Sequence, residues 1–192
     1  MSDSLVILLH GVGSSGADIG GLAPALAPSL PNTKFVGPDG PGRFNGGYQW
    51  FSVVGVTAEN RPARVDAARP AFDAIISDII GREGFAGRLD RVALVGFSQG
   101  SIMALDAIAS GHWSVAGVVA FSGRLASPEP LEPVKGAKLL LVHGTEDHMM
   151  PVSEVANAEG KLSPLGVVTS NFIQPGLGHS VSAEGVAEAA KF

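Results

Sequence analysis

Short apolar runs alternate with helical patterns along the whole chain, and this alternation restricts the fold more than any other feature. Six runs have the length of a β-strand, at residues 4–9, 33–36, 91–95, 115–121, 138–142 and 167–173. Helical patterns separate them, at about 18–29, 63–82, 99–109, 152–163 and 181–191. Strands that are apolar throughout are buried on both faces, which indicates a parallel sheet covered by helices. The sequence therefore predicts an α/β fold with about six mostly parallel strands and right-handed crossovers.

Length and composition indicate one globular domain over residues 1–192, because no internal repeat or linker divides the chain. Hydrophobic residues make up 45% of the chain and charged residues 16%, as in a protein with a real core. The net charge of −5 and the absence of a Lys/Arg cluster argue against binding to nucleic acid or to an anionic membrane surface. The chain has no Cys, which excludes a thiol nucleophile, a zinc-thiolate site and a disulfide framework.

The amino-terminal sequence has no targeting signal that we recognise. Its apolar stretch runs only from Leu5 to Leu9 and no basic segment precedes it, so we do not expect a signal peptide. No other run approaches the roughly 18 apolar residues that a membrane span needs. We expect a cytoplasmic protein without stable membrane insertion. The sequence leaves the oligomeric state open, with a homodimer among the alternatives.

Residues 96–100 read Gly-Phe-Ser-Gln-Gly, a G-x-S-x-G pattern placed directly between the apolar run 91–95 and the helical pattern 99–109. A strand that turns tightly into a helix exposes the side chain at the turn, and Cβ atoms at the flanking glycines would collide across it. This context is the one required by the nucleophile elbow of an α/β-hydrolase. A Gly/Ser-rich turn after a strand is also common in itself, so Ser98 needs partners before it indicates chemistry.

Two later loops supply candidate partners in the order acid, then histidine, that this fold requires. Asp147 follows the run 138–142, and His179 follows the run 167–173, so both fall at the same sheet edge as Ser98. Asp147 could instead be a turn or cap residue, and the adjacent Glu146 is the alternative acid. His179 could be a loop histidine that only bonds backbone groups.

The other four histidines are poorer candidates for a general base. Two stand in His-Gly pairs at strand ends, where we expect them to hold loop geometry; these are His10 and His143. His112 follows the helix after Ser98 on the far edge of the sheet. His148 lies in the loop that should supply the acid.

The first loop contains a competing motif. Residues 11–16 match G-x-G-x-x-G after a strand, the dinucleotide-binding fingerprint, with Asp39 as a candidate ribose-binding acid. However, Asp39 lies 28 residues beyond Gly11 rather than about 20, and it follows a Gly-Pro break. The alternative is that the loop 10–13 is an oxyanion loop that places a backbone N–H beside Ser98.

The segment between Gly37 and Pro62 is too long and glycine-rich for a minimal connection. It contains Phe44, Tyr48, Trp50 and Phe51, which argue for a packed loop, with a short extra strand at 51–54. These rings either cap the core or line a substrate pocket, and Trp50 is our preferred pocket residue.

The chain resembles the phospholipase/carboxylesterase family, which includes the acyl-protein thioesterases. Four motifs, one of them with an attached proline, carry the resemblance over nearly the whole length: Leu9-His10-Gly11-Val12-Gly13, Gly96-Phe97-Ser98-Gln99-Gly100, His143-Gly144-Thr145-Glu146-Asp147 with Pro151, and Gly178-His179. Trp50-Phe51 is similar to the family's Trp-Phe-Asp loop. The resemblance implies Ser98 as nucleophile, His179 as base, Asp147 as acid, and oxyanion donors in the backbone N–H groups of Val12 and Gln99.

The sequence departs from the family pattern in three places. It starts directly at the strand of the oxyanion loop, Ser52 replaces the Asp of the Trp-Phe-Asp loop, and Met150 replaces the Val before Pro151. The last two departures leave the three proposed catalytic residues intact but bear on the acyl pocket, for which Trp50, Met149 and Met150 are candidates. No cap domain is inserted, because only residues 122–137 separate the fourth and fifth runs, so we expect an open pocket for short or medium acyl chains.

The resemblance thus implies a serine hydrolase that cleaves an ester or thioester through an acyl-enzyme, without metal or cofactor. Small esters, lysophospholipids, acylated proteins and thioesters all suit this chemistry, so the sequence leaves the natural substrate open. Two other hypotheses stand beside it: a catalytically inactive binding protein on the same fold, and a dinucleotide-dependent oxidoreductase that uses residues 11–16.

Overall fold

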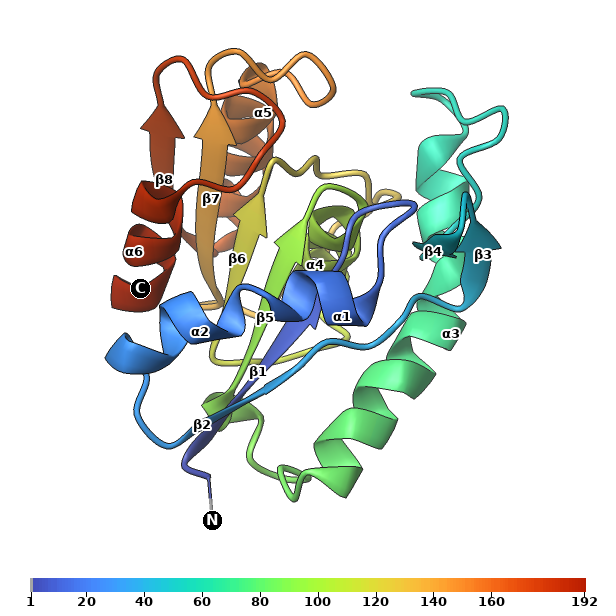
Figure 1. Ribbon diagram of the computed structural model, residues 1–192. Coiled ribbons are helices and arrows are strands. Elements are labelled where there is room, and N and C mark those ends of the chain that lie inside the picture. The colour runs from blue at the N-terminus through green and yellow to red at the C-terminus, as the bar shows by residue number, and fades with distance from the viewer. Residues whose placement is uncertain (1) are drawn as a thin grey trace.

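The computed structural model describes residues 2–192 and contains a six-stranded sheet flanked by helices (Figure 1). The strands of this sheet are β1 (Ser4–Leu9), β2 (Thr33–Val36), β5 (Val92–Phe97), β6 (Gly117–Phe121), β7 (Lys138–Gly144) and β8 (Val168–Gln174). Their spatial order is β2-β1-β5-β6-β7-β8, and every neighbouring pair is parallel. All carboxyl ends therefore meet at one edge of the sheet, as the sequence predicts.

Helices cover both faces of the sheet (Figure 1). They are α1 (Gly16–Gly20), α2 (Ala23–Leu26), α3 (Arg61–Arg82), α4 (Gln99–Ala109), α5 (Ser153–Leu162) and α6 (Ala183–Lys191), with short 3₁₀ turns η1 (Ala27–Ser29), η2 (Leu89–Arg91) and η3 (Ser163–Leu165). The core on one face is built with α3, α4 and α5, and the core on the other face with α1, α2 and α6. The fold is that of an α/β-hydrolase without a cap.

Alternate residues of β1 enter the two different cores, which explains why the strand is apolar throughout. Leu5, Ile7 and Leu9 pack with α3 and α4, whereas Val6 and Leu8 pack on the opposite face. All five are at most 5% exposed. Each buried side chain of this size contributes about 1.5–3 kcal/mol of transfer free energy, so a polar residue on either face would be destabilising.

The predicted helix at 18–29 is wrong, because the structure breaks it into α1, α2 and η1. Gly20 and Gly21 end the first piece, and Gly21 is its C-cap residue. Pro24 and Pro28 each stand in the first turn of a new piece, where their missing N–H groups do no harm. The other predicted helices and strands are present, with ends shifted by no more than about two residues.

The extra strand predicted at 51–54 is also wrong, because those residues are irregular. The extended residues lie earlier, in an antiparallel hairpin of β3 (Gly42–Phe44) and β4 (Gly47–Gln49). Asn45 and Gly46 form its turn with φ of 47° and 84°. Asn-Gly is the preferred pair for such a two-residue turn because both positions need positive φ, and this was the signal in the sequence.

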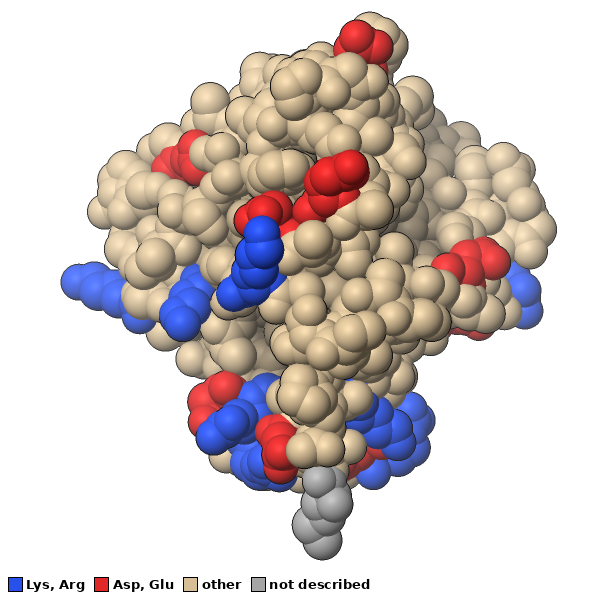
Figure 2. Space-filling view, turned by 60° about the vertical axis from the view of Figure 1, so that its left-hand side comes forward, with Lys and Arg blue, Asp and Glu red and all other residues tan. Residues whose placement is uncertain are grey.

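The edge of the sheet at the carboxyl ends is open. Residues 122–137 between β6 and β7 form neither helix nor strand, so nothing is inserted over the edge. Figure 2 shows Lys and Arg in the middle and lower parts of one face, interleaved with Asp and Glu, and only isolated acidic side chains at the top where β7 and β8 end. In residues 2–192, no helix has both the length and the apolarity to cross a bilayer.

Candidate active site

Ser98 lies at the tight turn between β5 and α4, at the centre of the open edge. Its backbone has φ 54° and ψ −116°, outside the regions that L-residues normally occupy. The turn is held by the Ser98 N–H, which donates to the Phe121 carbonyl over 3.0 Å. Ser98 is 8% exposed, which leaves its hydroxyl accessible only from the hollow above the turn. Such strain persists only where the surroundings impose it, as at functional sites.

Two glycines make this turn sterically feasible. A Cβ atom at Gly96 would lie 2.5 Å from the backbone nitrogen of Ser101, and one at Gly100 would lie 2.1 Å from the Leu9 carbonyl oxygen. Both distances are far inside van der Waals contact, and the obstructing atoms are backbone atoms. The G-x-S-x-G pattern is therefore a packing requirement between the elbow, α4 and the end of β1.

The loops after β7 and β8 bring Asp147 and His179 together. The Thr145 N–H donates to the Gln174 carbonyl over 3.0 Å, and the Glu146 N–H donates to the Leu177 carbonyl over 2.9 Å. These bonds continue the β7–β8 pairing beyond the sheet, so the two loops are fixed relative to each other. Asp147 is 4% exposed, and the His179 ring packs against Phe97 with centroids 4.9 Å apart.

A chain of two hydrogen bonds connects the three side chains. His179 Nδ1 donates to Asp147 Oδ2 over 2.8 Å, and His179 Nε2 lies 2.9 Å from Ser98 Oγ. With the Nδ1 proton directed to the carboxylate, Nε2 presents its lone pair to the serine hydroxyl. The sequence positions 98, 147 and 179 therefore converge in space, in the arrangement that a serine nucleophile and its base require.

The environment of Asp147 keeps it ionised. Burial alone would raise the pKa of its carboxyl, but the hydrogen bonds from the Met150 N–H and from His179 outweigh burial and hold this pKa below its usual value of 3.8. Asp147 Oδ1 accepts from the N–H groups of Met149 and Met150, over 3.0 and 2.8 Å. A carboxylate with these fixed donors can orient the imidazole and stabilise its cation.

The alternative acid and the other histidines lie elsewhere. Glu146 and His148 are exposed on the same loop, whereas Asp147 points inward to His179. His143 Nε2 donates to the Met150 carbonyl over 2.8 Å, so it holds the acid loop as predicted. His112 bonds to Asp73 between α3 and the segment after α4, at the other end of α4 from Ser98.

The expected oxyanion donors flank Ser98. Gln99 is the first residue of α4. The backbone N–H of a first helical residue has no partner within the helix. Gly11 lies against the elbow, because a Cβ built on it would be 3.4 Å from the Ser98 Cβ, and Val12 follows it in the same loop. Within residues 2–192, no backbone group accepts from the Val12 N–H.

A hollow of about 430 Å³ opens over Ser98 and His179. Its walls come mainly from the oxyanion loop, from α1 and from the segment after it, and they include Val12, Ser14, Asp18, Ile19, Leu22, Phe97 and Met149. Our sequence-based prediction did not include α1 among the walls of the pocket. The available signal was its position, because a helix that directly follows the oxyanion loop must begin at the same sheet edge. Met149 is 72% exposed and forms part of the rim.

Trp50 and Met150, the other predicted pocket residues, do not line this hollow. Trp50 is 3% exposed, and its ring packs edge-on against Phe72 in the core between the sheet and α3. Met150 is partly buried against the same core. Of the two interpretations of the aromatic segment, the structure thus supports the one that places Trp50 in the core.

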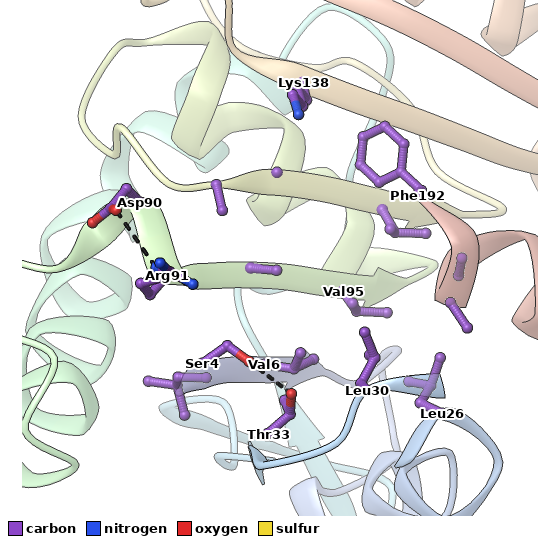
Figure 3. Close-up of a pocket in the computed structure, with 17 residues that line it drawn as sticks. Ser4, Val6, Leu26, Leu30, Thr33, Asp90, Arg91, Val95, Lys138 and Phe192 are labelled. Carbon is purple, nitrogen blue, oxygen red and sulfur yellow. Dashed lines mark hydrogen bonds and ion pairs between the residues drawn. The ribbon is translucent and has the colours of Figure 1, made fainter. Parts of the chain in front are cut away.

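A second hollow of about 300 Å³ lies on the sheet face between α2 and α6 (Figure 3). Its walls are mostly apolar, with Val6, Val95 and Leu26 pointing into it and the charged Arg91 and Lys138 around it. It contains neither a histidine nor an activated hydroxyl, since the Ser4 hydroxyl is paired with Thr33 over 2.6 Å. The hollow at Ser98 is therefore the candidate active site on chemical grounds.

The dinucleotide motif and its candidate acid have partners within the protein. Asp39 Oδ1 accepts from the Gly16 N–H over 2.8 Å, so the candidate ribose-binding carboxylate is used to hold the loop. The loop is also bonded to the hairpin, with the Gly13 N–H donating to the Tyr48 carbonyl over 2.8 Å. A Cβ at Gly16 would lie 2.0 Å from the Gly37 carbonyl oxygen, and one at Gly11 would lie 3.4 Å from the Ser98 Cβ, so these glycines serve close packing against the segment after β2 and against the elbow.

Comparison with known proteins agrees with this geometry. The family model for phospholipase/carboxylesterase matches residues 2–192. Esterase YpfH of Escherichia coli is 36% identical over 184 residues, covering 94% of this chain and 77% of that protein. Acyl-protein thioesterase 1 of Neurospora crassa is 27% identical, covering 93% of this chain and 81% of that protein. The crystal structure of esterase PE8 superposes with a TM-score of 0.90 at 34% identity, covering 100% of this chain and 91% of that one. The chain therefore belongs to the phospholipase/carboxylesterase family and is a hydrolase with an α/β-hydrolase fold.

Proposed function

We propose that the chain hydrolyses short- to medium-chain acyl esters or thioesters, with Ser98 as nucleophile, His179 as general base and Asp147 as the acid that orients it. The observation that carries this proposal is the chain of hydrogen bonds from Ser98 Oγ through the His179 ring to Asp147, of 2.9 and 2.8 Å. Family membership supports it and argues against the dinucleotide-dependent oxidoreductase.

The chemistry runs in two half-reactions. Ser98 Oγ attacks the acyl carbonyl while His179 Nε2 takes its proton, and Asp147 stabilises the imidazolium. The tetrahedral oxyanion accepts from the Val12 and Gln99 N–H groups, and each such donor is worth about 3–4 kcal/mol in comparable sites. His179 then protonates the leaving alcohol or thiol. Water, deprotonated by His179, hydrolyses the acyl-enzyme and restores Ser98.

The hollow at Ser98 supports a small acyl group rather than a long chain. Its volume of about 430 Å³ is at the lower end for ligand pockets, and no inserted segment covers it. Ile19, Leu22 and Phe97 offer apolar contact, and Asp18 is the one carboxylate among the residues that line it, which include neither Lys nor Arg. We infer that the acyl group occupies this hollow and that it carries no negative charge.

A fluorophosphonate probe with intact-mass analysis tests the proposal. We expect stoichiometric phosphonylation of the wild type and none of Ser98→Ala. Ser98→Ala and His179→Ala should each remove turnover of p-nitrophenyl acetate almost completely, because each removes one end of the same proton transfer. An unlabelled wild type, or labelling that survives Ser98→Ala, would instead indicate an inactive binding protein on this fold.

An acyl-chain-length series, measured as kcat/KM for matched esters and thioesters, tests the substrate range. We expect an optimum at short or medium chains and a decline beyond it, because longer chains would leave the hollow for water. A rate that rises steadily to long chains would contradict the assignment. Cytoplasmic location stays a prediction, and a homodimer stays one of the alternatives for the oligomeric state.

A further inference from the structure

The side chain of Gln99 does not point to the hollow. It is 3% exposed, and it is bonded at both ends to the backbone that follows β4. Gln99 Oε1 accepts from the Trp50 N–H over 2.8 Å, and Gln99 Nε2 donates to the Phe51 carbonyl over 2.8 Å. The first residue of α4 is thus attached to residues 50–51 by two buried hydrogen bonds.

Trp50 in turn holds the oxyanion loop. Its indole Nε1 donates to the His10 carbonyl over 3.0 Å, and its ring stacks on the His10 ring with centroids 5.3 Å apart. His10 is fully buried, donates from Nδ1 to the Gly11 carbonyl over 2.7 Å and accepts at Nε2 from the Gly40 N–H over 2.8 Å. The path from Trp50 therefore ends one residue before Val12.

We propose that Trp50 and the Gln99 side chain form a clamp that sets the spacing and direction of the two oxyanion N–H groups. Trp50 is a positioning residue, since it does not line the hollow at Ser98, and Gln99 positions its own N–H through its side chain. This inference rests on the proposed function. Oxyanion stabilisation depends on donors that are already oriented, and a buried, fully bonded polar network provides such rigidity.

The clamp gives a chemical reason for glutamine after the nucleophile. Every residue except proline offers a backbone N–H at position 99, so the oxyanion hole alone does not select the side chain. Pairing with the Trp50 N–H and the Phe51 carbonyl together requires one acceptor and one donor on the same planar group, and a carboxamide has both. A hydrocarbon side chain would leave both backbone groups buried without partners.

Trp50→Phe tests the clamp, because it removes the indole N–H but keeps an aromatic ring against Phe72 and His10. Trp113→Phe is the matched control. Its Nε1 donates to Asp73 Oδ1 over 2.7 Å, and it lies between α3 and the segment after α4, away from Ser98. Both variants lose one indole hydrogen bond, but only Trp50→Phe loses a bond to the oxyanion loop.

For Trp50→Phe we expect kcat for p-nitrophenyl acetate to fall about 10- to 100-fold. This is less than the roughly 10²- to 10³-fold loss of kcat on removal of one oxyanion-hole donor, because the N–H groups are misplaced but not removed. KM should stay within about twofold, because ground-state binding does not use the oxyanion hole. A boronic acid, whose tetrahedral adduct places an oxygen in the hole, should bind more weakly by a similar factor. Trp113→Phe should keep kcat and boronic acid affinity, whatever its melting temperature.

Gln99→Met provides a second variant with a side chain of similar length. The double variant Trp50→Phe/Gln99→Met should lose less kcat than the product of the two single fold-losses, since both substitutions act on the same clamp. A folded Trp50→Phe or Gln99→Met with wild-type kcat would overturn the clamp. So would an equal loss of kcat in Trp113→Phe. Phosphonylation of the wild type at Ser98 is measured in parallel, so failure of the proposed function would be seen separately as an unlabelled wild type.

Discussion

Asp147 and Glu146 are neighbours in the chain, but their side chains have different surroundings. Asp147 accepts from His179 and from two backbone N–H groups, whereas Glu146 is exposed on the outside of the loop. Both residue types could serve as the acid, and the sequence alone only favours one of them. The distinction arises because the loop directs consecutive side chains to opposite sides, which only the folded loop shows.

This difference predicts unequal effects of two matched substitutions. Asp147→Asn should lower kcat for p-nitrophenyl acetate by about 10⁴-fold, because an amide favours the wrong tautomer of the histidine. Glu146→Gln should stay within about twofold of the wild type. Steady-state kinetics at neutral pH check both, and substantial loss in Glu146→Gln with an active Asp147→Asn would transfer the acid role to Glu146.

Asp18 predicts a charge preference at the hollow. Ser14 and Ser15 donate to its Oδ2 over 3.0 and 2.8 Å, and these bonds, that of Ser15 above all, hold the pKa of its carboxyl below the usual value, so it is ionised at neutral pH. Its charge disfavours acyl groups that end in a carboxylate and favours those that end in a cation. The effect is modest, because an exposed charge is screened by water and salt.

We expect Asp18→Asn to raise kcat/KM about two- to fivefold for an ester whose acyl chain ends in a carboxylate. It should lower kcat/KM for the matched trimethylammonium ester and leave the uncharged ester unchanged. The measurement is the ratio of kcat/KM across these three p-nitrophenyl esters at low and high salt. Equal changes for all three would show that Asp18 acts through structure rather than through charge.

At the scale of elements, the elbow depends on how closely α4 approaches the end of β1. The glycine at position 100 allows this contact, since a Cβ there would lie 2.1 Å from the Leu9 carbonyl oxygen. Gly81 in α3 is also a helical glycine, but a Cβ at that position would meet nothing within 4 Å. Backbone atoms therefore exclude any side chain at Gly100, whereas a side chain at Gly81 has room.

Gly100→Ala should destabilise the protein by several kcal/mol and reduce activity, because backbone must move and overpacking costs about 1–3 kcal/mol even in adaptable cores. Gly81→Ala should be neutral or stabilising by up to about 1 kcal/mol, since alanine is the better helix former. Urea unfolding monitored by circular dichroism compares the two. A Gly100→Ala variant as stable as the wild type would contradict the close approach.

At the scale of the whole molecule, Asp147 links the active site to acid stability. Burial acts to raise the pKa of its carboxyl, but hydrogen bonds from the Met150 N–H and His179 outweigh burial and hold the pKa in the folded protein below the ordinary value of 3.8. The unfolded chain then binds the proton more readily than the folded one. The stabilising contribution is present above the unfolded pKa and is lost as the pH falls through the folded pKa.

The wild type should therefore lose more unfolding free energy than Asp147→Asn when the pH is lowered from 7 to about 3. Urea titrations of both proteins at several pH values in this range measure the difference directly. An equal or larger loss in Asp147→Asn would show that the carboxylate at 147 contributes nothing to this pH dependence.

Several features were predictable from the sequence because their causes are local. The period of apolar residues along each strand reflects burial on both faces, and it predicted the parallel sheet and its helical layers. The elbow was predictable because its glycines and serine are adjacent in the chain. The parallel direction of the strands then placed Ser98, Asp147 and His179 at one edge, because the carboxyl ends of parallel strands lie together.

Other features depend on contacts between distant segments, and only the tertiary structure shows them. The burial of Trp50 follows from packing against residues far away in the chain. The division of 18–29 and the hairpin at 42–49 did have local signals, in the Gly20-Gly21 pair with its following prolines and in Asn45-Gly46, but the apolar period along the chain does not register them. The same holds for the pairing of the Gln99 side chain with residues 50–51, since glutamine has no local preference that reveals a partner 49 positions earlier. The sequence by itself determined the parallel sheet and the loops that carry Ser98, Asp147 and His179 to one edge. The walls of the hollow and the partners of Gln99 and Trp50 were decided by tertiary contacts, because side-chain direction is set by the neighbours a residue meets in space.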